Sequence, residues 1–596
     1  MKSEKPVMLL KGFYKNRLYP VLLVFGYLLL LGVDVYFLDY FKKGEITEIL
    51  KTWVPWGLKI NFFLLLTAVL FCLRDFGSLA KKFFNVKGVL LVILLCVAFL
   101  MVTFLTYRTH RIYYDEDIYA NVGQNIALAG QTGYCNYGTF EYGEYYPHWL
   151  SYNKEPSGWP FLISLAFQLF GVDEAHAFSL NNLLFSLGVL VAFFIAWHIT
   201  GRFLPAFLAG VAYMLIPHNL IWSNTAAAEP SAVALSGLCV LSVVVYLKRR
   251  RTRHLFVMAA IVPLACQMRP ESMMVMGWAF LAFLVISPRA FVDRRLWTMG
   301  LVTTLFLLPH FLHFYAVSGH SWGAQGSKFS LEFLLHNLHT NGIYYLNDTS
   351  FPVLVTVFAL MGLFCAQNRK WQWLMFFWFL PFWGIFLFFY AGSYTYGADV
   401  RFALLSFMPI AILAGMGGGW IGHKLMNVGG SPATAEETLS DNGKVLKWTM
   451  GKKALVSGFL LLILAFSFLK FIPLVRRVGQ EAWGSRHDHQ YARMFVDMLP
   501  ERSIVLTQNP TMFLLWRQNA IQTYAGINNP DLIKTLFERY QGHVYFHHNY
   551  WCNTKNKRNI RLCQDIRDRY ELEKIAEETE QDYRYGIFKM KSKDSP

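Results

Sequence analysis

Three consecutive carboxylates stand in a chain that is otherwise poor in charge. Asp115, Glu116 and Asp117 follow closely on an apolar stretch, residues 88–107. Adjacent carboxylates repel one another, so they need a cation, a proton or a substrate donor nearby. A carboxylate that accepts the proton of a hydroxyl acts as a general base, and this cluster could perform that chemistry. The alternative is a solvated acidic turn, and the spacing alone does not decide between the two.

Two basic residues near apolar stretches could bind an anion. Lys154 ends a long polar loop and is followed by Glu155 and a proline, and Arg401 leads into another apolar stretch. An ammonium or a guanidinium in such a place can bind a phosphate. Each has a structural alternative: an interfacial lysine whose charged end reaches water, or an ion pair between Arg401 and Asp399.

Arg269 and Glu271 flank a proline in a tight turn between two apolar stretches. Charges so close to hydrocarbon are costly and are usually paired. Arg269 is therefore either a phosphate ligand or the partner of Glu271 or Glu229. His310 and His313 share a helix face, which would allow a metal site with carboxylates as further ligands. We predict no metal and no other cofactor, because such histidine pairs more often serve as hydrogen-bonding groups; a divalent metal is the alternative.

The composition indicates a membrane protein that must position these residues. Of 596 residues, 55% are hydrophobic and 16% charged, against about 25% charged in soluble domains. The net charge of +17 would suggest nucleic acid in a soluble protein, but the basic residues gather at the ends of apolar stretches. We therefore expect membrane lipids as partners and no nucleic acid. Thirteen stretches are long enough to span a bilayer: 18–38, 54–73, 88–107, 176–199, 203–222, 230–247, 254–268, 271–287, 296–316, 351–367, 371–390, 401–420 and 454–471.

The positions of the basic residues predict the orientation of these spans. With the N-terminus in the cytoplasm, the basic loops alternate correctly only if residues 158–171 do not cross the membrane. All the candidate site residues then lie at the outer face, at or near the loop 108–157 and the later outer turns. No cleavable signal peptide is predicted, because the first apolar stretch follows a polar segment and lacks a cleavage site.

We predict three regions. Residues 1–87 form an N-terminal segment with two transmembrane helices, 88–471 the main membrane domain, and 472–596 a small extracytoplasmic α/β domain. Within the last region, strands are expected at 503–507, 543–546 and 583–590, and helices at 531–540 and 559–570. Cys552 and Cys563 could form a disulfide across a short loop in an oxidising compartment, or remain free thiols.

Several short motifs resemble the GT-C glycosyltransferases that use lipid-phosphate sugars, in particular the bacterial relatives of protein O-mannosyltransferases and the lipid A aminoarabinose transferase. They lie in order over residues 88–420: Asp115-Glu116-x-x-Tyr119-Ala120, Glu155-Pro156 followed by Phe161–Gly171, Glu229-Pro230, Arg269-Pro270-Glu271, and Asp399-x-Arg401-Phe402 with Pro409. Two features depart from these relatives. Two additional spans precede the acidic pair, and the order Lys154-Glu155-Pro156 replaces Glu-Lys-Pro.

The resemblance implies a GT-C fold in the plasma (inner) membrane and a sugar donor carried on a polyprenyl phosphate. It implies an acceptor hydroxyl on an envelope glycan, a lipid or a protein, and inversion at the anomeric carbon. Asp115 would be the catalytic base and Glu116 its support. Lys154, Arg269 and Arg401 would hold the phosphate, and Glu155, Glu271 and His310 would lie in the same substrate site. The main alternative is a transporter or flippase of lipid-linked or anionic precursors; a non-catalytic assembly protein is a second.

Overall fold

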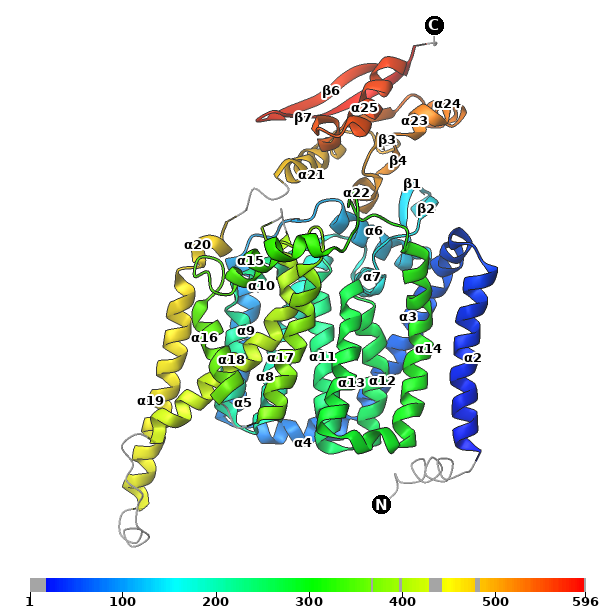
Figure 1. The fold of residues 1–596 in the computed structure, drawn as a ribbon. Coiled ribbons are helices and arrows are strands. Elements are labelled where there is room, and N and C mark those ends of the chain that lie inside the picture. Colours follow the sequence, from blue (N-terminus) through cyan, green and yellow to red (C-terminus); the bar gives the residue numbers. More distant parts are fainter. Residues whose placement is uncertain (1–17, 366–367, 396–398, 428–441, 478–482, 594–596) are drawn as a thin grey trace.

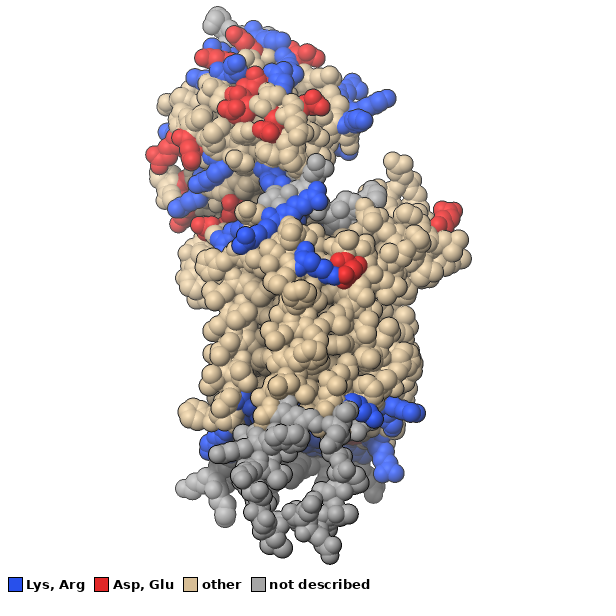
Figure 2. Space-filling model, turned by 90° about the vertical axis from the view of Figure 1, so that its left-hand side faces the viewer, with Lys and Arg blue, Asp and Glu red and all other residues tan. Residues whose placement is uncertain are grey.

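A computed structural model describes residues 18–365, 368–395, 399–427, 442–477 and 483–593. A bundle of apolar helices carries a smaller domain with a β-sheet at one end, which we call the cap domain (Figure 1). The helix α4 (Leu73–Phe83) lies across the opposite end of the bundle (Figure 1). Figure 2 shows a broad band of the bundle surface with few charged side chains, bordered at its lower edge by Lys and Arg.

Each of the thirteen predicted apolar stretches coincides with a helix, a broken helix or a helix continued by a single-turn element. Seven helices, or eight if the pair α9 and α10 with its 63° bend is one span, are long and apolar enough to cross a membrane. A count of thirteen spans therefore stays a prediction. The helices are α2 (Tyr19–Tyr40), α3 (Lys43–Phe71), α5 (Val86–Leu100) with η1 (Met101–Leu105), α8 (Ala175–Thr200), α9 (Phe203–Met214), α10 (Pro217–Ser223), α11 (Glu229–Arg249), α12 (Thr252–Cys266), η2 (Pro270–Met273) with α13 (Met274–Ile286), α14 (Arg294–Val317), α16 (Val353–Cys365), α17 (Arg369–Gly384), α18 (Leu404–Asn427) and α19 (Asn442–Leu469).

Two short helices lie where the bundle meets the cap domain. The helix α6 (Asp115–Leu128) begins at the acidic cluster and packs against α7 (Gly158–Phe170). Gly123 permits this close approach, because a Cβ there would lie 3.0 Å from the Pro160 carbonyl oxygen. Both helices lie at the cap end of the bundle (Figure 1). With 13 residues, α7 is about 20 Å long, too short to cross a hydrocarbon core of about 30 Å, as the basic-residue pattern predicts.

The cap domain is built on one seven-stranded mixed sheet with the order β2-β1-β4-β3-β5-β7-β6. Its strands come from two distant parts of the chain. The hairpin β1 (Tyr134–Glu141) and β2 (Glu144–Ser151) belongs to the first long loop, and β1 pairs antiparallel with β4 (Asn519–Gln522). The sheet thus crosses the predicted boundary at residue 472, and the hairpin was not predicted.

The predicted elements of the last region are present with small shifts. They correspond to β3 (Ile504–Thr507), α24 (Pro530–Arg539), β5 (Val544–His548), α25 (Lys557–Arg569) and β7 (Tyr583–Ser592). Cys552 and Cys563 form a disulfide. Elements that the sequence did not predict are α21 (Trp483–Val496), α22 (Pro510–Leu515), β4 and β6 (Tyr570–Glu580).

Candidate functional site

Asp115 begins α6, and the residue before it fixes the direction of the helix. Tyr114 has a φ of 66°, a left-handed conformation that costs about 1–2 kcal/mol in a residue with a side chain. The cap domain holds Tyr114 in this conformation, because its hydroxyl donates to Asp488 Oδ2 at 2.8 Å and its ring stacks on Trp551. The Asp115 side chain, 34% exposed, is left open at the start of the helix.

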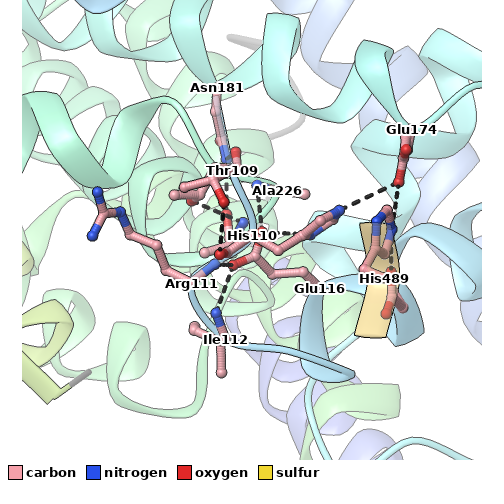
Figure 3. Close-up of polar contacts among 12 residues, drawn as sticks. Thr109, His110, Arg111, Ile112, Glu116, Glu174, Asn181, Ala226 and His489 are labelled. Carbon is pink, nitrogen blue, oxygen red and sulfur yellow. Dashed lines mark hydrogen bonds and ion pairs between the residues drawn. The ribbon is translucent and has the colours of Figure 1, made fainter. Parts of the chain in front are cut away.

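Glu116 differs from its neighbour, because it is fully buried and its oxygens accept four hydrogen bonds. Oε1 accepts from the backbone N–H groups of Arg111 and Ile112 at 2.8 and 2.9 Å. Oε2 accepts from the Ala226 N–H at 2.8 Å and lies 3.0 Å from His110 Nδ1. Figure 3 shows these contacts converging on one carboxylate. Glu116 thereby ties the loop before α6 to the turn before α11.

Asp117 is also buried and faces the cap domain. Its Oδ2 accepts from Asn509 Nδ2 at 3.0 Å, and its Oδ1 lies 3.7 Å from His489 Nε2. Burial raises the pKa of Asp117, and the charges of His489 and His110 oppose that shift. The alternative of a solvated acidic turn is therefore excluded for Glu116 and Asp117, since neither is solvated.

Arg269 is held between two carboxylates at the same end of the bundle. Its Nη1 donates to Glu229 Oε1 at 2.7 Å and its Nε to Glu271 Oε1 at 2.6 Å, and it is 4% exposed. The ion-pair alternative is thus what the geometry shows. Burial alone would lower the pKa of Arg269, but the charges of Glu229, Glu271 and Glu155 raise it well above its ordinary value. This guanidinium stays charged and joins the start of α11 to η2.

Arg401 connects this group of charges to Asp115. It lies in η6 (Asp399–Ala403), with Nε 3.6 Å from Glu229 Oε1 and Nη1 4.0 Å from Asp115 Oδ2. Its guanidinium lies over the Phe402 ring at 5.0 Å. The side chain of Asp399 is outside the described residues. Its contacts with Glu229 and Asp115 are longer than a hydrogen bond, and a guanidinium has five N–H groups, so it can bind an anion in addition to a carboxylate.

Lys154 and Glu155 lie beside the same group. Within the described part of the chain, the Lys154 side chain makes no ion pair or hydrogen bond, while Glu155 has a buried Oε2 without a partner. Burial raises the pKa of Glu155; the charges of Arg269 and Lys154 lower it, and those of Glu271 and Asp115 raise it further. Five segments thus bring acidic and basic groups together at the cap end of the bundle: the start of α6, the loop with Lys154 and Glu155, the start of α11, the turn with Arg269 and Glu271, and η6.

Part of the sequence and the overall fold are similar to those of known proteins. Residues 154–313 match the family model described as dolichyl-phosphate-mannose-protein mannosyltransferase. The fold is similar to that of ArnT from Cupriavidus metallidurans, solved in the apo state and bound to undecaprenyl phosphate, with a TM-score of 0.53 and 14% identity over 85% of this chain and 98% of that chain. The archaeal oligosaccharyltransferase AglB from Archaeoglobus fulgidus matches with a TM-score of 0.45 and 12% identity over 85% of this chain and 75% of that chain. No curated protein matches the sequence significantly.

The two comparisons agree on the membrane bundle: residues 154–313 resemble the mannosyltransferase family model, and the chain has a fold similar to that of ArnT. Of the predicted site residues, five lie in the segment matched by the family model: Lys154, Glu155, Arg269, Glu271 and His310. Asp115, Glu116 and Arg401 lie outside it.

His310 is buried within α14 of the membrane bundle. Its ring stacks parallel to that of His313, with centroids 6.0 Å apart, and its Nε2 has no hydrogen-bond partner. His313 Nδ1 lies 2.9 Å from the Tyr152 hydroxyl, which places this face of α14 near the segment that carries Lys154. His313 therefore lies next to the segment that carries Lys154, and His310 lies beside His313 on the same helix.

Three polar residues near α6 were missed by the sequence analysis: His110, Glu174 and His489. His110 Nε2 and His489 Nε2 lie 3.3 and 3.2 Å from Glu174 Oε2 (Figure 3). Burial would lower the pKa of His110, but hydrogen bonds with Glu116 and Glu174 and the charges of Glu116 and Asp117 raise it well above its ordinary value. The three residues are separated by 64 and 315 positions, and no local motif joins them.

Proposed function

We propose that the enzyme transfers a sugar from a polyprenyl-phosphate donor to an acceptor hydroxyl on a cell-envelope glycan, lipid or protein, with inversion and with Asp115 as general base. The observation that carries the proposal is the contrast within the acidic cluster. Glu116 and Asp117 are buried and directed at protein groups, whereas Asp115 is open to an incoming molecule. Arg401 Nη1 lies 4.0 Å from Asp115 Oδ2, and its guanidinium is suited to an anionic leaving group.

The chemistry follows from these positions. The acceptor hydroxyl oxygen forms a bond to the anomeric carbon from the face opposite the phosphate, and the bond between that carbon and the phosphate oxygen breaks. The hydroxyl proton passes to Asp115, and the polyprenyl phosphate leaves with the electron pair of the broken bond. One displacement of this kind inverts the anomeric centre. A general base of this type contributes typically about 10²- to 10⁴-fold to the rate.

Lys154 and Arg401 are the proposed phosphate ligands. Lys154 has no competing ion pair among the described residues, and the guanidinium of Arg401 lies 4.0 Å from Asp115 Oδ2, beside the proposed base. Arg269 is already bonded to two carboxylates, so we assign it to positioning Glu229 and Glu271. Glu155 and His310 have unpartnered buried atoms and complete the substrate site.

The proposal includes an orientation. The N-terminus, which is outside the described residues, lies in the cytoplasm, and the cap domain lies on the opposite side of the plasma (inner) membrane. Support comes from the alternation of basic loops and from the basic lower edge of the uncharged band (Figure 2). A transporter would more often place ionisable groups near the bilayer midplane. Here they gather at one end of the bundle, which favours transfer over transport.

Asp115→Asn tests the assignment of the base. The amide keeps the size of the side chain but cannot accept the proton, so we expect normal membrane insertion and a loss of transfer of about 10²-fold or more. Glu144→Gln, an exposed residue at the tip of the hairpin, is the control and should keep full activity. The measurement is mass analysis of envelope lipids, glycans and proteins from cells that express each variant. Wild-type product from Asp115→Asn would refute the assignment.

A further inference from the structure

We propose that His110, Asp117, Glu174 and His489 form a structural Zn²⁺ site that fastens the cap domain to the membrane bundle. One ligand atom from each residue lies within 4.8 Å of every other. The four residues come from four segments: the loop before α6, the first turn of α6, the residue before α8, and α21 of the cap domain. We call these four residues the clamp cluster. It goes beyond the proposed transfer reaction, which uses none of them as a base or a phosphate ligand.

The distances within the clamp cluster fit one metal ion. Glu174 Oε2 lies 3.3 Å from His110 Nε2 and 3.2 Å from His489 Nε2, and His489 Nε2 lies 3.7 Å from Asp117 Oδ1. Zinc binds nitrogen and carboxylate oxygen at about 2.0–2.1 Å, so the edge of a ligand tetrahedron is about 3.3–3.4 Å. Three of the six distances between the ligand atoms are therefore close to the expected spacing, and the other three are at most 4.8 Å.

Burial and hydrogen bonding point to a missing partner. Asp117 is 1% exposed, and among the described residues its Oδ1 has no hydrogen bond, although His489 Nε2 lies 3.7 Å away. His110 Nε2 and His489 Nε2 both approach the same oxygen of Glu174 (Figure 3). An unpaired buried acceptor is costly, and two carboxylates directed at one point repel each other. A divalent cation at the centre would satisfy all four ligand atoms.

The surroundings of the clamp cluster orient its ligands as metal sites require. His110 uses Nδ1 for Glu116 at 3.0 Å, which leaves Nε2 for the metal. Such a carboxylate behind a histidine ligand fixes its tautomer and its orientation. Asp117 uses Oδ2 for Asn509 of the cap domain at 3.0 Å, which leaves Oδ1 for the metal. In His110 and Asp117 the second polar atom of the side chain thus has another partner, and the remaining atom faces the cluster.

The ligand set favours zinc in a structural role. Two imidazoles with two carboxylates suit Zn²⁺ better than Ca²⁺ or Mg²⁺, which prefer oxygen alone. Four protein ligands close the coordination sphere and leave no position for a substrate, as in structural zinc sites. Since Asp117 is two residues from Asp115, the metal would hold the first turn of α6 and α21 of the cap domain together.

The test is the metal content of the full-length protein, purified in detergent with any affinity tag removed. After incubation with ZnSO₄ and dialysis, the wild type should retain about one Zn²⁺ per chain. His489→Gln and Asp117→Asn should retain less than a tenth of that amount. His487→Gln is the matched control, because it lies on the same helix and contacts Trp483 instead of the cluster. Equal zinc in His489→Gln and the wild type, or no retained zinc in the wild type, would overturn the proposal.

Two further measurements keep the test independent of folding failure. Co²⁺ loaded into the wild type alone should give the intense visible absorption of a four-coordinate site, whereas the weak spectrum of a six-coordinate ion would overturn the assignment. In addition, EDTA should increase hydrogen exchange in α21 of the wild type and of His487→Gln. Equal exchange in α21 with and without EDTA would show that no metal fastens the cap domain. Neither result depends on whether the enzyme transfers a sugar.

Discussion

Replacing Glu116 should damage the fold, whereas replacing its neighbour should damage only the chemistry. Glu116 accepts three backbone N–H groups and lies within hydrogen-bond distance of His110, in a fully buried place. In Glu116→Gln, the amide oxygen can accept hydrogen bonds from two of these four groups. The NH₂ group faces the other two, which then lose their acceptor. A flip of the amide changes which pair is lost but not the number.

The cost follows from the number of unpaired buried groups. Each costs about 1–3 kcal/mol, so two cost about 2–6 kcal/mol. If the NH₂ end faces the Ala226 N–H and His110, the His110 ring can change its tautomer and accept a hydrogen bond from the amide. Only one buried group is then left without a partner, and the cost is about 1–3 kcal/mol. Either loss is large beside a typical stability of about 5–15 kcal/mol. Glu116→Ala leaves all four groups unpaired and should be less stable still.

The assay is the thermal denaturation of full-length protein in detergent, followed by the loss of monodisperse protein. The expected order of stability is wild type and Asp115→Asn together, then Glu116→Gln, then Glu116→Ala. Asp115→Asn is the internal control, because its side chain is partly exposed and makes only a long contact. If Glu116→Gln is as stable as Asp115→Asn, the reasoning that Glu116 ties two loops together is refuted.

Two other changes test separate parts of the molecule. Arg401→Ala should weaken the binding of undecaprenyl phosphate about 10- to 100-fold, which corresponds to the loss of a charge-assisted hydrogen bond of about 1.5–3 kcal/mol. The affinity of Arg401→Lys should lie between those of the wild type and Arg401→Ala, because lysine keeps the charge but not the two parallel N–H groups of the guanidinium. Unchanged binding curves for Arg401→Ala would exclude Arg401 as a phosphate ligand. In the cap domain, burial and the charge of Arg567 lower the pKa of His548 to about 3. The imidazole of His548 then stays neutral in the folded state, whereas in the unfolded state it gains a proton below about pH 6.5. The cap domain therefore loses stability as the pH falls from about 6.5 towards 3, and the loss in the free energy of unfolding is about 2 kcal/mol at pH 5. The urea midpoint of the cap domain in the full chain should show this loss, and His548→Gln should reduce it; an equal loss in both would contradict the assignment.

The membrane bundle could be predicted from the sequence because its physical cause is local. A stretch of about 20 apolar residues indicates a membrane-spanning helix. The alternation of basic loops indicated in addition that residues 158–171 do not cross the membrane. The helix α7 found there is short and begins at Gly158, where a Cβ would meet the Gln267 carbonyl oxygen at 2.4 Å. That close contact between distant segments is not visible in a pattern of hydrophobic residues.

The sheet and the clamp cluster could not be predicted, because both depend on pairing over long separations. The strand β1 was read as part of a polar loop, since its partner β4 lies almost 400 residues later and is only four residues long. His489 similarly has no sequence feature that connects it to Asp117. The motif Asp115-Glu116 was found from its resemblance to a family, but the different surroundings of its two carboxylates arise from the turn at Tyr114 and from the cap domain.

The helix α6 gives the three carboxylates three different tasks. Successive residues in a helix are about 100° apart, so three adjacent side chains cannot face the same neighbour, and their repulsion is spread over three environments. Asp115 faces Arg401 and the open side, Glu116 faces the loops of the bundle, and Asp117 faces the cap domain. A movement of the cap domain would act on Asp117 directly and would rotate or shift the whole first turn. The position of the proposed base therefore depends on the docking of a domain that contributes no atom to the proposed reaction.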